Sequence, residues 1–150
     1  MSKHMKKPVD MRCARNNEQR AVLERILQKG RCPFCMPDLK KYHREEIYEY
    51  GHWLLTRNQW PYRGAEEHWL LILRRHAERI ADIPVGAWSD LGVIVRDLER
   101  SLKLRGGALA MRFGDSSVTG ATVLHIHAHL IVPQMNEKTK RARVVRFPIG

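Results

Sequence analysis

Three histidines, His125, His127 and His129, alternate with apolar residues at positions 126, 128 and 130. Successive side chains of a β-strand point to opposite faces, so a strand here would place all three imidazoles on one face. Burying three such rings without partners is costly, which indicates a functional site and not a row of core residues. Two kinds of chemistry fit the row. One is nucleophilic and proton-donating catalysis by neutral imidazoles; the other is metal binding through all three rings.

A second candidate site is the segment Cys32-Pro33-Phe34-Cys35. Two thiolates at this spacing can bind one tetrahedral ion, so the pair is a natural half of a zinc site. The same spacing also fits a redox pair or two small buried apolar residues. Cys13, the third cysteine, lies in a basic segment near the N-terminus, and we interpret it as incidental.

The elements that must position these residues follow from apolar periodicity and from turn residues. A helix is expected over residues 16–29, with Asn16 or Asn17 as its N-terminal cap and Gly30 at its end. Strands are expected over residues 47–57, 67–74, 108–113 and 123–132, a second helix over 87–104, a loop over 114–120, and a further strand over 144–147. Strands in local pairs with one long helix between them predict an α+β fold with an antiparallel sheet.

The length of 150 residues suits one domain. The basic excess lies at the ends: residues 1–31 carry nine Lys or Arg against three acidic residues, and residues 136–150 carry five against one. We therefore expect a basic, poorly ordered segment over 1–15, a domain over 16–135 and a basic extension over 136–150. The ends either attract nucleic-acid phosphates or are simply solvated. Three cysteines fit a reducing compartment, so a cytoplasmic protein without a membrane segment is expected.

The histidine row resembles the signature of the histidine triad (HIT) nucleotide hydrolases and transferases. Three further segments are similar to the family in the same order: Asn58-Gln59-Trp60-Pro61-Tyr62, His68 to His76, and Gly120 to His125. Together the resemblance covers residues from about 32 to 133. It departs from the family at Glu67 for glycine, Arg74 for proline, Ala121 for glutamine, and Gly114-Asp115 for asparagine and a variable residue. The last two departures concern the substrate pocket more than the reaction.

The resemblance implies a HIT-like fold, with an antiparallel sheet of about five strands, one long helix and additional shorter helices, in a homodimer. It implies a structural zinc ion bound by Cys32, Cys35, His76 and His125. The chemistry of imidazole and the family both favour His127 as the nucleophile that forms a nucleotidyl–histidine intermediate. His129 and His68 would donate hydrogen bonds to phosphate oxygens.

The expected substrate contacts are Asn58, from the family-like segment, and Thr122, whose hydroxyl would face the leaving group. Ser116 and Ser117 would supply phosphate donors, unless they only build the loop. The expected activity is hydrolysis or transfer at the α-phosphate of a nucleoside phosphate ester, phosphoramidate or dinucleoside polyphosphate. Two alternatives remain open at this point. One is a nucleic-acid-associated protein that acts on nucleotidylated strand ends; the other is a non-catalytic metal-binding module.

Overall fold

The structure, a computed structural model, describes residues 7–150 of the chain. Its helices are α1 (Asn17–Lys29), α2 (Asp38–Tyr42), α3 (Val85–Ser101) and α4 (Ser116–Thr119), with short 3₁₀ helices at Met11–Cys13 and Ile80–Asp82. Its strands are β1 (Ile47–Tyr50), β2 (Trp53–Arg57), β3 (Ala65–Leu73), β4 (Ala108–Met111), β5 (His127–Pro133), β6 (Met135–Asn136) and β7 (Arg141–Ala142). In this part of the chain no helix combines the length and the apolar character needed to cross a membrane.

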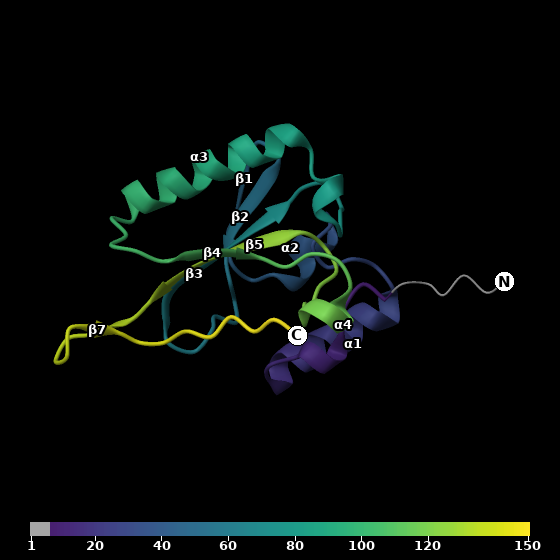
Figure 1. The fold of residues 1–150 in the computed structure, drawn as a ribbon. Coiled ribbons are helices and arrows are strands. Elements are labelled where there is room, and N and C mark those ends of the chain that lie inside the picture. The colour runs from purple at the N-terminus through teal and green to yellow at the C-terminus, as the bar shows by residue number, and fades with distance from the viewer. Residues whose placement is uncertain (1–6) are drawn as a thin grey trace.

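Five of the strands form one sheet in the order β1-β2-β3-β5-β4, and every neighbouring pair is antiparallel. The long helix α3 lies along one face of this sheet, whereas α1 and α4 lie toward the other side (Figure 1). The expected α+β architecture, a five-stranded antiparallel sheet with one long helix, is therefore confirmed.

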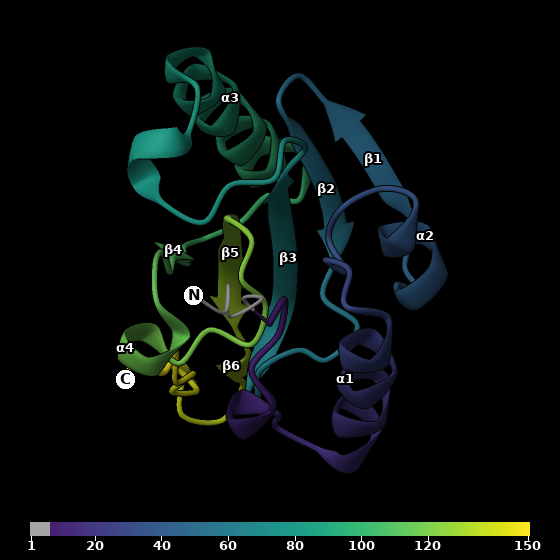
Figure 2. The same ribbon diagram turned by 90° about the vertical axis from the view of Figure 1, so that its right-hand side faces the viewer.

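The face of the sheet under α3 holds the main hydrophobic core. Ile126, Ala128 and Leu130 all belong to it, as the alternation of the histidine row requires. From α3 the core takes Ala87, Leu91, Ile94 and Leu98, which recur at helical spacing. The histidines between the apolar residues are consequently directed to the opposite face, where His127 and His129 share a pocket with residues of α1; Figure 2 shows α1 well away from α3.

Helix α1 begins and ends as its sequence predicts. The side chain of Asn16 accepts a hydrogen bond from the backbone N–H of Gln19 (2.7 Å), which satisfies one of the donors left free at a helix start. Gly30 ends the helix with φ of 65°, a left-handed conformation that glycine adopts without steric cost. The helix packs through Val22, Leu23 and Ile26, which are buried together with Val9.

Several elements differ from the expectation, three of them near the site or in the number of elements. Residues 47–57 form a hairpin of β1 and β2 and not one strand, because the chain turns at Gly51, whose φ is 52°. The strand expected over 123–132 begins only at His127, so His125 precedes it. The loop expected over 114–120 contains α4, capped by the side chain of Asp115 on the N–H of Ser117.

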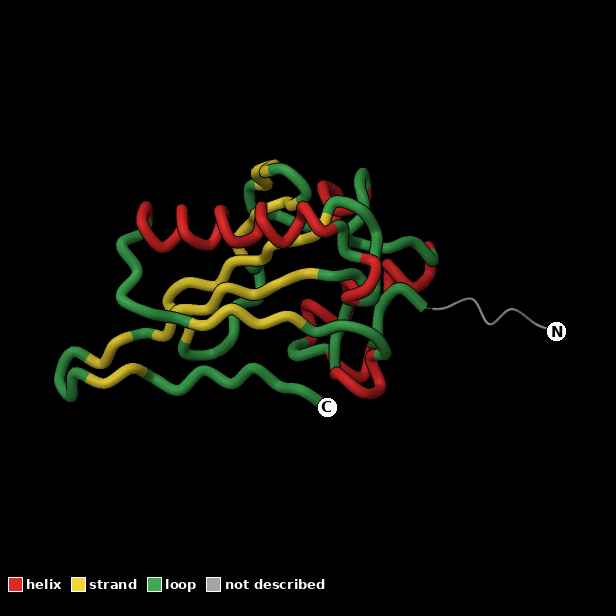
Figure 3. The backbone as a smooth tube through the Cα atoms, turned by 45° about the horizontal axis from the view of Figure 1, so that its top comes forward, coloured by secondary structure: helices red, strands yellow, loops and turns green. Residues whose placement is uncertain are grey.

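Both ends of the chain return to the domain. Val9 is 2% exposed and forms a bridge with Val123, which differs from the poorly ordered segment expected over 1–15; residues 1–6 lie outside the described part. After the β6–β7 hairpin, residues 143–150 run back beside the sheet (Figure 3). No strand forms over 144–147; the short strand lies at Arg141–Ala142 instead.

Candidate active site and metal centre

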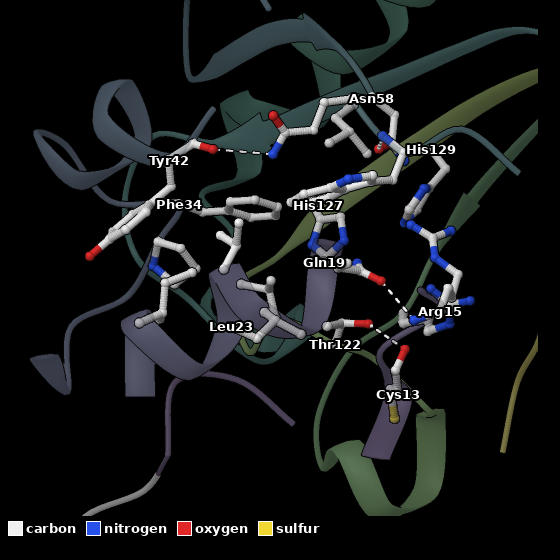
Figure 4. Close-up of a pocket in the computed structure, with 18 of the residues that line it drawn as sticks. Cys13, Arg15, Gln19, Leu23, Phe34, Tyr42, Asn58, Thr122, His127 and His129 are labelled. Atoms are coloured by element: carbon white, nitrogen blue, oxygen red, sulfur yellow. Dashed lines mark hydrogen bonds between the residues drawn. The ribbon is translucent and has the colours of Figure 1, made fainter. Parts of the chain in front are cut away.

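A pocket of about 260 Å³ lies on the face of the sheet away from α3. His127 and His129 form part of its wall, together with Phe34 and with Leu23 of α1. Figure 4 shows the two imidazoles near the centre, with Phe34 on one side and Arg15 on the other. The pocket therefore has an apolar side and a cationic side, and the histidines lie between them.

His127 is held in one tautomer by the backbone. Its Nδ1 lies 2.6 Å from the carbonyl oxygen of His125, and because a carbonyl can only accept, Nδ1 carries the proton. Nε2 therefore presents a lone pair. Burial lowers the pKa of this imidazole to about 4, so the ring is neutral at pH 7. A neutral, oriented imidazole of this kind is a competent nucleophile.

His129 and His68 form a hydrogen-bonded relay that starts at the backbone of Tyr62. The N–H of Tyr62 donates to Nδ1 of His68 (3.1 Å), so His68 carries its proton on Nε2. That nitrogen lies 2.9 Å from Nδ1 of His129, which must accept. The proton of His129 is then on Nε2, a buried atom without a hydrogen-bond partner among residues 7–150. A buried free donor beside a nucleophile is suited to an anionic oxygen.

The relay changes the role expected for His68. Both of its ring nitrogens are already engaged by Tyr62 and His129, which leaves no free N–H for a phosphate oxygen. Burial, with the nearby positive charge of Arg15, lowers the pKa of His68 to about 3, so the ring is neutral. The geometry makes His68 a positioning residue that fixes the tautomer of His129.

Four side chains, from Cys32, Cys35, His76 and His125, converge beside the pocket, and one potential ligand atom of each lies within 4.8 Å of all the others. The Nδ1 atoms of the two histidines are 3.2 Å apart. Nδ1 of His125 is 3.3 Å from the sulfur of Cys32 and 3.6 Å from that of Cys35. Tetrahedral zinc has edges of about 3.3 Å between nitrogens and about 3.6 Å between nitrogen and sulfur. The cluster therefore has the dimensions of a Cys₂His₂ metal site.

The surroundings of the cluster also suit a cation. His125 donates Nε2–H to the carbonyl of Leu73 (2.6 Å), which leaves the lone pair on Nδ1, toward the thiols. The other ring nitrogen of His76 is 3.7 Å from the carboxylate of Glu78, an arrangement common around metal-bound histidines. Burial raises the pKa of Cys32 to about 12, so this thiol needs a bound cation to ionise at neutral pH. The donor set fits a structural zinc ion.

The four expected substrate residues separate into two pairs. Asn58 and Thr122 line the pocket, and the hydroxyl of Thr122 donates to the carbonyl of Cys13 (3.2 Å). Ser116 and Ser117 are not among the lining residues. The hydroxyl of Ser116 donates to Asp10 (2.9 Å) and that of Ser117 to Asp115 (2.8 Å). The geometry gives the two serines a part in fixing α4 and no contact with the pocket.

The comparison with protein families shows which family this chain belongs to. The family described as HIT domain matches residues 41–136. The chain belongs to the HIT family. An uncharacterized HIT-like protein of Mycobacterium tuberculosis, found in two strains, is 27% identical over 115 residues, which are 75% of this chain and 78% of that protein.

Solved structures confirm the HIT fold. A histidine triad nucleotide-binding protein from Candida albicans superimposes with a TM-score of 0.54 at 23% identity, covering 75% of this chain and 80% of that one. A HIT family hydrolase from Legionella pneumophila gives 0.51 at 23% identity, over 65% and 90%. A zinc-bound histidine triad family protein from Mycobacterium smegmatis gives 0.50 at 22% identity, over 69% and 75%.

Two arginines of this HIT domain pocket, Arg15 and Arg112, were not anticipated from the sequence. Arg15 precedes α1 in the segment expected to be poorly ordered, and Arg112 directly follows β4. Neither belongs to a motif, and their approach to the histidines depends on contacts between distant parts of the chain. The basic charge of the N-terminal segment was the available signal for Arg15, but it did not indicate that this side chain lies in the pocket.

Proposed function

We propose that this HIT protein is a nucleotidyl hydrolase or transferase that acts through a nucleotidyl–histidine intermediate on His127. The observation that carries the proposal is the fixed tautomer of His127, whose Nδ1–H is held by the carbonyl of His125 at 2.6 Å. Its Nε2 lone pair is thereby available on the ring that lines the pocket. The substrate class is a nucleoside phosphate ester, phosphoramidate or dinucleoside polyphosphate.

The reaction runs in two displacements at the α-phosphorus. In the first, Nε2 of His127 forms an N–P bond while the bond from phosphorus to the leaving group breaks; the leaving group departs with that electron pair, and an amine or alcohol leaving group takes up a proton from the solvent. In the second, water or phosphate attacks the same phosphorus, the N–P bond breaks, His127 regains its lone pair, and the proton of an attacking water is released to the solvent. The labile phosphoramidate splits one difficult displacement into two easier ones.

Charge that develops on the phosphoryl oxygens is stabilised by His129. Its Nε2–H is a buried donor without a partner in the described chain, and a donor already in place needs no reorganisation during the reaction. His68 keeps that proton on the correct nitrogen through the 2.9 Å contact with Nδ1 of His129.

The nucleoside has a place on the apolar side of the pocket. Phe34 stands edge-on to His127, with ring centroids 4.9 Å apart, and Leu23 and Trp60 complete that side of the lining. Aromatic and aliphatic side chains suit the flat faces of a nucleobase. The printed description of the Candida albicans neighbour as nucleotide-binding, and that of the Legionella neighbour as a hydrolase, agree with this proposal.

A structural zinc ion completes the proposal, with Cys32, Cys35, His76 and His125 as its ligands. Four protein ligands leave no open position, so the ion would stabilise the fold and take no part in the displacement. The zinc-bound neighbour from Mycobacterium smegmatis supports this identity of the ion. The homodimer and the nucleic-acid contact of the basic ends stay predictions of the sequence.

The test is a His127→Asn variant assayed on adenosine 5′-phosphoramidate and diadenosine tetraphosphate. The amide cannot form the covalent intermediate, so turnover should fall by at least about a thousandfold while the melting temperature and zinc content stay unchanged. In the wild-type chain, rapid acid-free quenching and intact-mass measurement should reveal a population that carries one nucleotidyl group. Near-normal turnover by the variant would exclude the mechanism. Release of metal by this variant would favour the metal-binding module, in which His127 is a ligand.

A further inference from the structure

Two positive charges face the histidines without a negative partner. Arg15 and Arg112 both line the pocket, and within residues 7–150 no ion pair to a carboxylate is formed by either of them. Burial lowers the pKa of both His68 and His129, and the positive charges of Arg15 and Arg112 lower it further. The contrast is Arg12 on the same wall, which is paired with Asp10 at 2.6 Å.

The contacts that Arg15 and Arg112 do make are all neutral. The guanidinium of Arg15 lies over the ring of Tyr62, 4.4 Å from its centroid. Arg112 donates from Nε and Nη2 to the carbonyl of Pro148 (2.8 and 2.6 Å) and from Nη2 to the hydroxyl of Tyr62 (3.1 Å). It also lies 3.8 Å from the centroid of Phe147. Carbonyl, phenol and aromatic groups satisfy N–H donors, but they do not neutralise a charge.

The pocket therefore holds more positive charge than the transferred phosphoryl group can neutralise. A phosphodiester or phosphoramidate carries about one negative charge at its reacting phosphorus, and the free N–H of His129 already faces that group. Two further guanidiniums match two further anionic oxygens, as a longer phosphate chain supplies them. Arginine is well suited to this, because its charge does not titrate and its guanidinium binds phosphate oxygens strongly.

We propose that Arg15 and Arg112 form an anion subsite for the leaving group, so that this HIT domain prefers substrates whose leaving group is itself a phosphate chain. Dinucleoside polyphosphates belong to that class, whereas one-phosphate esters and phosphoramidates do not. The inference rests on the proposed function for the identity of the transferred group. When the phosphoanhydride bond breaks, the electron pair stays on the leaving phosphate oxygen, and the two guanidiniums stabilise that charge without transferring a proton.

Binding measurements test the subsite independently of the catalytic step. In a His127→Asn background, calorimetry with AMP and with diadenosine tetraphosphate measures affinity while turnover is blocked. The polyphosphate should bind at least tenfold more tightly than AMP. Adding Arg15→Gln or Arg112→Gln should each lower the affinity for the polyphosphate by about tenfold, which corresponds to the loss of one charge-assisted contact. The affinity for AMP should fall by less than threefold. Arg112→Lys should recover part of the loss, since it keeps the positive charge but loses the paired hydrogen bonds to the carbonyl of Pro148.

Arg100→Gln provides the matched control. Arg100 is an exposed arginine of α3, on the far side of the sheet from the pocket (Figure 1), so the substitution removes one positive charge from the chain without touching the site. Both affinities should stay within twofold. If Arg100→Gln lowered the affinity for the polyphosphate as much as the pocket variants do, the effect would come from the net charge of the chain alone, and the inference would be overturned.

The outcomes keep the two proposals apart. The leaving-group subsite is refuted if Arg15→Gln and Arg112→Gln lower the affinities for AMP and for the polyphosphate equally. It is also refuted if the parent His127→Asn chain binds the polyphosphate no more tightly than AMP. Turnover that survives His127→Asn refutes the proposed mechanism and leaves the binding result intact. In the chain with His127, each arginine variant should lose more kcat/KM on diadenosine tetraphosphate than on adenosine 5′-phosphoramidate, again by about tenfold; equal losses count against the subsite.

Discussion

The relay from Tyr62 through His68 to His129 gives a quantitative prediction for His68→Phe. Phenylalanine fills a similar volume but can neither accept the hydrogen bond of Tyr62 (3.1 Å) nor donate to His129 (2.9 Å). Leaving the buried N–H of Tyr62 unsatisfied should cost about 2 kcal/mol. For a chain of this size that corresponds to a fall of about 6 °C in the melting temperature.

The catalytic effect of His68→Phe should appear in kcat and not in KM. The ring of His129 remains, but its tautomer and orientation are no longer fixed, so we expect kcat to fall by about tenfold, or 1.4 kcal/mol. KM should change by less than twofold, because both ring nitrogens of His68 are engaged inside the protein. Steady-state kinetics on adenosine 5′-phosphoramidate and thermal unfolding measure the two effects.

His68→Gln is the matched variant, because its amide offers one acceptor and one donor. It should recover most of the stability and most of kcat, and ¹⁵N chemical shifts of His129 should again report a proton on Nε2. A His68→Phe variant with kcat within twofold of the wild type would refute the relay. So would a glutamine variant that is as slow as the phenylalanine variant, since the loss would then come from packing alone.

Three further changes test other parts of the site. Cys32→Ser should lose about one zinc ion per chain together with melting temperature, because a structural site contributes folding free energy directly; elemental analysis of chelator-free protein checks this, and a zinc-free wild type would contradict it. His129→Asn should lower kcat by about a hundredfold through loss of one donor while zinc content is retained; metal release would instead support the three histidines as ligands. Burial lowers the pKa of His68 in the folded chain to about 3. Between pH 6.5 and pH 3 the imidazole of the unfolded chain therefore binds a proton, whereas that of the folded chain does not. The free energy of unfolding should consequently decline as the pH falls from 6.5 toward 3. Melting temperatures between pH 7 and 4 should decline less steeply in His68→Gln; identical slopes would show that His68 does not contribute.

The sequence predicted the local features of the fold because each rests on a short-range rule. Alternation placed Ile126 and Ala128 in the core and the histidines on the other face, and the capping residues Asn16 and Gly30 bounded α1. The hairpin at Gly51 was missed because apolar residues continue on both sides of the turn. A glycine within an apparently continuous strand was the available signal.

The candidate site was predictable where its residues belong to motifs of the sequence, and not where a contact depends on the backbone or on a residue outside any motif. Spacing and resemblance indicated the cluster that contains Cys32, Cys35, His76 and His125, and the structure brings the four together. The relay through His68 depends on the backbone N–H of Tyr62, which has no sequence signature. Arg15 was missed for a related reason, since its place over the ring of Tyr62 is a contact between distant segments.

The return of both chain ends to the pocket has a consequence for how the molecule opens. His127 and His129 lie on β5, the middle of three strands that form a continuous ladder from β3 to β4. The N-terminal wall is attached through the bridge and the buried side chain of Val9 and through a few backbone hydrogen bonds, such as Asp10 to Thr122. The opposite wall is attached through Arg112 and the carbonyl of Pro148. Detaching an end therefore breaks far fewer contacts than separating the strands. Amide hydrogen exchange should consequently be slow in the sheet and faster in the segments at the two ends.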